Sequence, residues 1–130
     1  MPENGGGQIV CLKVANPAAE AEFFGKVYGS EPFELSASTL QVDTGSFLLR
    51  FERGGPGQDG EHVRFEINVD NVNKFTEEVW NRGVKYAARP RNHEDGLRRV
   101  GFASPSGIFI IGVGPPKMDS AGALPTVKLE

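Results

Sequence analysis

The pattern of hydrophobic and polar positions along this chain occurs twice in the same order. Residues 9–14 form a short, mostly apolar run that is typical of a strand. The stretch that follows has apolar residues at helical spacing, with Asn16 as a capping residue at its start and Gly29 as a stop at its end. Three short strand patterns come next, near residues 33–37, 40–43 and 46–52. The first half therefore predicts one helix and four strands in the order βαβββ.

The second half of the chain repeats this order. Residues 62–69 alternate between apolar and polar side chains, which is typical of a strand with one buried face. Asn71 can cap the next helix and Gly83 can end it, as Asn16 and Gly29 do in the first half. Strand patterns resume near residues 84–89, 97–103 and 108–113. Because one strip of sheet with one helix cannot bury its own apolar face, the repeat predicts an α+β fold in which two tandem βαβββ modules form curved mixed sheets around a concave pocket.

Length and composition set the limits of this fold. The chain has 130 residues, of which 38% are hydrophobic, and this suits one compact domain. The 17 Gly and 9 Pro agree with frequent turns and short strands. We expect a single domain over residues 8–115, with module one at about 8–53 and module two at about 61–115, and flexible tails at 1–7 and 116–130.

Charge and cysteine content narrow the function classes. The net charge of −3 comes from Lys and Arg scattered among Asp and Glu, so we expect no nucleic-acid partner and no membrane partner. The single cysteine, Cys11, cannot form an internal disulfide, and no apolar run approaches the roughly 20 residues that span a bilayer. The N-terminus lacks the features of a signal peptide, which favours a cytoplasmic location. Small molecules and other proteins are the classes of binding partner that these observations do not exclude.

Three short motifs occur in an order that resembles a known superfamily. They are residues 12–16, residues 67–72 and the turn at 102–107, which has the sequence Phe-Ala-Ser-Pro-Ser-Gly before the last strand. On these motifs the chain resembles the vicinal oxygen chelate superfamily, which includes glyoxalase I, bleomycin resistance proteins, fosfomycin resistance enzymes and extradiol dioxygenases. The resemblance covers about residues 8–114. It implies paired βαβββ modules, a homodimer and a pocket within the curved sheets.

The resemblance also bears on a metal cofactor. Enzymatic members of the superfamily bind a divalent metal through His, Gln or Glu side chains on the first and last strands of each module. The matching positions of this chain are Ile9, about Leu49, Arg64 and Ile111. Hydrocarbon side chains cannot bind a metal, and a permanently charged guanidinium repels a dication. The resemblance therefore implies a member without a metal cofactor.

Two histidines leave one alternative open. His62 lies two residues before Arg64 on the same face of the predicted strand, and Glu66 and Glu52 could join it as metal ligands. A divalent metal held by these three residues would give a glyoxalase-type or dioxygenase-type enzyme with a non-standard ligand set. His93 lies in a predicted hairpin loop at residues 92–96, where a catalytic role is not expected.

The expected pocket is mostly apolar and aromatic, which is the usual composition of a small-molecule site. If the register of the superfamily holds, the side chains that face the concave surface are Ile9, Cys11, Phe47, Leu49, Phe51, Arg64, Glu66, Phe109, Ile111 and Val113. Charged groups on an enclosed face are costly unless they are paired or meet a ligand, so we expect Arg64 and Glu66 either to pair with each other or to anchor the ligand's polar end. One of the neighbours Arg98 and Arg99 must also face inward.

These residues favour a metal-independent protein that binds a small hydrophobic or aromatic molecule, similar to drug-sequestering proteins of the bleomycin resistance type. The metal-dependent enzyme described above is the first alternative. An interaction module whose pocket is packed shut is the second.

Overall fold

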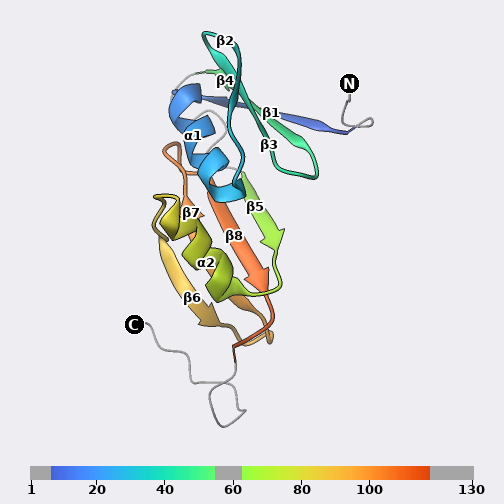
Figure 1. Ribbon diagram of the computed structural model, residues 1–130, viewed down its shortest axis with the longest axis vertical. Helices are drawn as coiled ribbons and strands as arrows, with labels where there is room; N and C mark the ends of the chain where they lie inside the picture. The colour runs from blue at the N-terminus through green and yellow to red at the C-terminus, as the bar shows by residue number, and fades with distance from the viewer. Residues whose placement is uncertain (1–6, 55–62, 118–130) are drawn as a thin grey trace. The chain divides into compact units, whose positions relative to one another are not determined.

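The computed structural model describes residues 7–54 and 63–117 (Figure 1), and within them it confirms the α+β fold of two tandem βαβββ modules. Each module forms a four-stranded mixed sheet with one helix. The chain divides into two compact units, one built on each sheet, and they are described separately. Most of the expected tails at 1–7 and 116–130, and the candidate ligand His62, lie outside the described residues.

The first sheet has the strand order β1-β4-β3-β2. Its strands are β1 (Ile9–Val14), β2 (Phe33–Ser36), β3 (Thr39–Asp43) and β4 (Leu48–Arg53). β1 runs parallel to β4, whereas β3 pairs antiparallel with both β4 and β2. A parallel neighbour needs a long crossover, and the helix after β1 together with the meander of β2 and β3 provides it.

Helix α1 (Pro17–Tyr28) begins and ends where the sequence predicts. The side chain of Asn16 accepts a hydrogen bond from the backbone N–H of Ala19 at 3.1 Å, and Gly29 takes the left-handed conformation at φ 74° that ends the helix. The helix packs on β1, β3 and β4, where the ring of Phe24 meets that of Phe51 with their centroids 5.0 Å apart. These contacts form the core of the first unit.

The second sheet repeats this topology with the order β5-β8-β7-β6. Its strands are β5 (Arg64–Asn68), β6 (Ala88–Asn92), β7 (Arg98–Ala103) and β8 (Phe109–Gly114). Helix α2 (Val72–Asn81), capped by the side chain of Asn71, lies across β6, β7 and β8 on one face of the sheet (Figure 1). No helix in the described part of the chain is long and apolar enough to cross a membrane.

The sixth strand differs from its expected position. The sequence predicted a strand at residues 84–89, but β6 begins only at Ala88 and continues through Pro90 to Asn92. Proline is tolerated because β6 is an edge strand and its pairing with β7 shifts between Ala88 and Arg91. Asn92 also holds Lys117 through two hydrogen bonds, so the expected C-terminal tail starts with an ordered contact.

The turn Ser104–Ile108, which joins β7 to β8, belongs to the first compact unit. The hydroxyls of Ser104 and Ser106 donate hydrogen bonds to the buried carboxylate of Glu20 on α1, and the Ser106 bond measures 2.7 Å. The Ser104 oxygen also accepts the backbone N–H of Ile108 at 3.0 Å. A buried carboxylate is costly without such donors, so this turn satisfies Glu20.

A glycine on β8 lets α2 lie close to the second sheet. A Cβ added at Gly112 would stand 2.8 Å from Cε2 of Phe75, which is closer than real Cβ contacts come. The Phe75 ring also meets Phe102 edge-on, with the ring centroids 6.0 Å apart. The absent side chain of Gly112 is therefore what makes room for the Phe75 ring.

We expect Gly112→Ala to lower the free energy of unfolding by about 1–3 kcal/mol, because the added methyl overpacks the interface between α2 and β8. Urea denaturation measures the change. In a Phe75→Leu background the same Gly112→Ala substitution should lower the free energy of unfolding by less, since the smaller side chain frees the space. If Gly112→Ala lowers the free energy of unfolding equally in both backgrounds, this explanation is contradicted.

Candidate functional site

The second sheet has one face that α2 covers and one that it does not. Phe75 of α2 lies against Gly112, so the residues that share the side of Gly112 face the helix. Strand alternation and the parallel pairing of β5 with β8 place the other set on the opposite side, which we call the open face. It carries all five pocket residues expected from this module, namely Arg64, Glu66, Phe109, Ile111 and Val113.

Side chains on the open face form three cross-strand rows. The rows are Asn68–Val113–Arg99–Arg91, Glu66–Ile111–Gly101–Ala88 and Arg64–Phe109–Ala103. The middle row is low at Gly101 and Ala88, and the ring of Phe109 leans over it: a Cβ added at Gly101 would stand 3.0 Å from Cε2 of Phe109. The Phe109 side chain nevertheless remains 36% exposed, so it offers an aromatic surface.

Charged side chains border this apolar centre. Arg64 and Glu66 form an exposed ion pair with Nη2 and Oε2 3.7 Å apart, which contributes little to stability in water. Arg99 is held more firmly, because both of its terminal nitrogens bond the Asp95 carboxylate, at 3.1 and 2.7 Å. Arg99 thus stays on the open face with one of its edges occupied.

The hairpin between β6 and β7 adds an open basin of about 510 Å³ at this end of the sheet. It is lined by Arg91, Asn92, His93, Glu94, Asp95 and Arg99. The hydrogen bond from Arg99, and after it the backbone N–H of Leu97, lower the pKa of Asp95 to about 2. Burial, with the nearby charges of Arg99 and Arg91, lowers the pKa of His93, so this imidazole is neutral at neutral pH.

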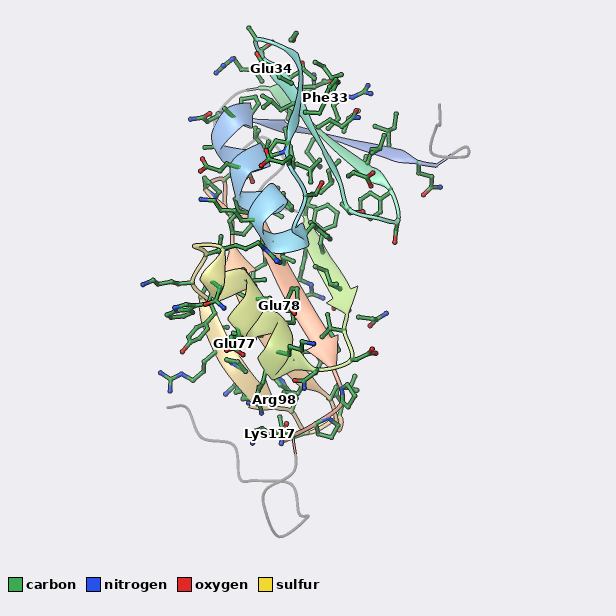
Figure 2. All side chains as sticks on the ribbon, viewed as in Figure 1. Phe33, Glu34, Glu77, Glu78, Arg98 and Lys117 are labelled. Atoms are coloured by element: carbon green, nitrogen blue, oxygen red, sulfur yellow. The ribbon has the colours of Figure 1, made fainter. Side chains whose placement is uncertain are left out.

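The structure also decides between Arg98 and Arg99. Arg98 lies on the α2 side near the start of the helix (Figure 2), where its Nε donates to Asn73 at 2.9 Å and its Nη1 to Asn92 at 3.2 Å. Arg99 is consequently the one that faces the open side, as strand alternation requires.

The first module differs from the sequence prediction at β4. Leu49 and Phe51 are fully buried beneath α1, so neither faces the same side as Ile9 and Cys11. Ile9 and Cys11 pair instead with Leu48 and Arg50, and their face is the one opposite the helix. The prediction for Leu49 and Phe51 was wrong because their apolar side is the side that the helix must cover.

This face of the first sheet is more polar than expected. Arg50 donates two hydrogen bonds to Oε1 of Gln41, at 3.1 and 2.9 Å. Nζ of Lys13 lies 3.8 Å from Oε1 of Glu52. Phe47 stands outside β4 in the preceding turn, half-buried, where it lines a depression together with Gly7, Asp43, Gly45 and Ser46. Cys11 is a free, exposed thiol.

The described residues offer no set of side chains that fits a divalent metal. The positions that the sequence resemblance matched to metal ligands carry the hydrocarbon chains of Ile9, Leu49 and Ile111 and the guanidinium of Arg64. No three His, Cys, Asp or Glu side chains within residues 7–54 and 63–117 gather in a group that could hold a metal ion. Glu52 and Glu66, which the alternative metal site would use, each form an ion pair, with Lys13 and Arg64 respectively.

The sequence matches no protein-family model and no curated protein. Solved structures do match. A glyoxalase / bleomycin resistance protein from Catenulispora acidiphila superposes with a TM-score of 0.67 at 20% identity, over 85% of this chain and 98% of that one. The chain has the glyoxalase/bleomycin resistance fold. TioX from Micromonospora sp. ML1 matches with a TM-score of 0.67 at 15% identity, over 85% and 99% of the two chains.

A protein named as an enzyme shares this fold as well. Lactoylglutathione lyase from Agrobacterium tumefaciens superposes with a TM-score of 0.62 at 14% identity, over 88% of this chain and 96% of that one. The fold expected from the vicinal oxygen chelate motifs is therefore confirmed. Because one fold can serve many unrelated functions, function has to be argued from the side chains of the site.

Arg91 and Gly101 are among the residues of the open face that sequence reasoning missed. Arg91 fell between the predicted strand, which ended at residue 89, and the predicted hairpin loop, which began at residue 92. Gly101 carries no side chain and so gave no signal. The pairing of Arg91 with Arg99 across β6 and β7 is what brings Arg91 to this face.

Asp95 provides a test of this arrangement. Its lowered pKa means that the contact with Arg99 stabilises the fold at neutral pH, and that this contribution is lost as the pH falls from about 4 through about 2. Carbon-detected NMR of the Asp95 carboxyl should give a midpoint near 2, which Arg99→Gln should raise toward 3.8. Arg91→Gln is the control and should leave the midpoint nearly unchanged; a shift of equal size in both variants would contradict the assignment.

Proposed function

We propose that this chain is a metal-independent protein that binds a small apolar or aromatic molecule on the open face of its second sheet. The observation that carries the proposal is the ring of Phe109, which lies over Gly101 and stays 36% exposed beside Ile111. Exposed aromatic surface on a rigid sheet with a few polar groups around it is the usual composition of a small-molecule site.

One further observation supports binding over metal catalysis within the fold that the chain shares with glyoxalase / bleomycin resistance proteins. The positions that the resemblance matches to metal ligands carry hydrocarbon chains and one guanidinium, as described above. Sequestration needs only affinity for the ligand, and an apolar surface can supply that without a reaction.

Residues predicted on the first sheet divide between its two faces. Ile9 and Cys11 belong to the face opposite α1, next to Arg50, whereas Leu49 and Phe51 belong to the core. The ligand-binding set of the proposal is therefore the five residues of the second module, and Ile9 and Cys11 stay predictions for the first module by itself. We also propose a homodimer, on the strength of the sequence resemblance, and a cytoplasmic location.

We expect saturable binding of planar aromatic compounds, followed by NMR through the methyl signals of Ile111 and Val113. Trp80 is a poorer reporter, because it lies on α2 against Tyr86, with ring centroids 5.1 Å apart. Phe109→Ala should weaken binding about fivefold, since an aromatic contact contributes about 1 kcal/mol.

Leu97→Ala is a matched control, because Leu97 is 37% exposed, close to the 36% of Phe109, but lies in the hairpin before β7. It should leave affinity unchanged. If no compound in a broad aromatic panel shifts the Ile111 and Val113 signals, or if Leu97→Ala and Phe109→Ala weaken binding equally, the open face is not the site.

A further inference from the structure

Two arginines stand directly opposite each other on the open face. Arg91 of β6 and Arg99 of β7 are cross-strand partners, and both are half-buried. Like charges placed opposite each other on neighbouring strands destabilise a sheet. Asp95 compensates Arg99 through its two hydrogen bonds, but it provides a single negative charge.

Arg91 has no such compensation. Within residues 7–54 and 63–117 the guanidinium of Arg91 makes no hydrogen bond and no ion pair, although it carries five N–H donors. Arg99 also keeps donors that Asp95 does not use, because only its two terminal nitrogens bond that carboxylate. Glu94 lines the adjoining basin of about 510 Å³ and Glu66 acts on Arg99 through its charge, but among the described residues neither forms an ion pair with Arg91 or Arg99.

The distance from this charge to the Phe109 ring suits a small aromatic acid. Residues on the same face of a strand are about 7 Å apart along the strand. Gly101, which the Phe109 ring covers, is the next residue on this face after Arg99. The Phe109 ring covers Gly101, and Ala88 beside Gly101 adds only a methyl group, so a ligand ring could stack against Phe109 without a large side chain between it and the arginines. A flat ring placed there would direct a carboxylate to Arg91 and Arg99.

We infer that Arg91 and Arg99 bind the carboxylate of the ligand, so that the ligand class is an aromatic carboxylic acid whose ring contacts Phe109. This inference rests on the proposed function, because it assigns ligand chemistry to the same open face. A single carboxylate matches the guanidinium of Arg91, which no carboxylate of the described residues bonds, and its two oxygens match the paired donors of a guanidinium.

Matched acids and amides distinguish the inferred carboxylate site from the proposed function. Benzoate, a naphthoate and an anthracene carboxylate are each compared with their carboxamides by isothermal titration calorimetry on the full chain. We expect the acid with the best-fitting ring to bind about tenfold more tightly than its amide, because hydrogen bonds between charged groups contribute about 1.5–3 kcal/mol before solvent screening. Added salt should weaken binding of the acid and leave the amide unaffected.

Arg91→Gln should remove the preference for the acid and leave amide binding unchanged. Lys74→Gln, an equal change of net charge on the exposed side of α2, is the control and should keep the preference. His93 gives a second readout. Burial and, after it, the charges of Arg99 and Arg91 lower the pKa of His93. A bound acid should raise this pKa in an NMR titration, because its carboxylate offsets the charges of the two arginines, whereas the amide should not.

The outcomes are distinct for the two proposals. If acid and amide bind equally well and Phe109→Ala weakens both, the carboxylate site is overturned and the proposed function stands. If neither the acids nor the amides bind, both proposals fall together. If the acids bind more tightly but Lys74→Gln reduces the preference as much as Arg91→Gln does, the effect is one of net charge and the site at Arg91 is overturned.

Discussion

The parallel pairing of the first and last strand in each sheet is the constraint on which the rest of this structure depends. β1 pairs with β4 and β5 with β8, and each register fixes which side chains share a face. Since side chains alternate along a strand, a slip of one residue would exchange the core with the surface. The helix then decides which face is buried, because each sheet has one helix to cover it.

Small residues allow both faces of the second sheet to carry aromatic rings. Gly112 makes room for Phe75 on the helix side, and Gly101, on the neighbouring strand, makes room for Phe109 on the open face. The first of these rings closes the core and the second remains in part exposed. The absence of two side chains thus shapes both the core and the candidate site.

The charges of the open face follow from the same pairing. Arg99 meets Asp95 within its own hairpin, whereas Arg91 meets only another arginine across the strands. The imbalance is local, since the chain as a whole has a net charge of −3. The apolar centre of this face thus lies beside one guanidinium, that of Arg91, which no carboxylate of the described residues bonds.

The sequence by itself determined the elements of this protein and their order. The caps Asn16, Gly29 and Asn71 act through hydrogen bonds and backbone angles within a few residues, and these local effects are visible in one dimension. The same local signals recur in the second half of the chain, and this repeat together with the motifs predicted the fold. Tertiary structure decided the faces of the first sheet and the extent of β6: Leu49 and Phe51 belong to the core because α1 covers them, and β6 extends through Pro90 to Asn92 because β7 offers it a partner. Such choices depend on residues distant in the chain, so local pattern could not make them.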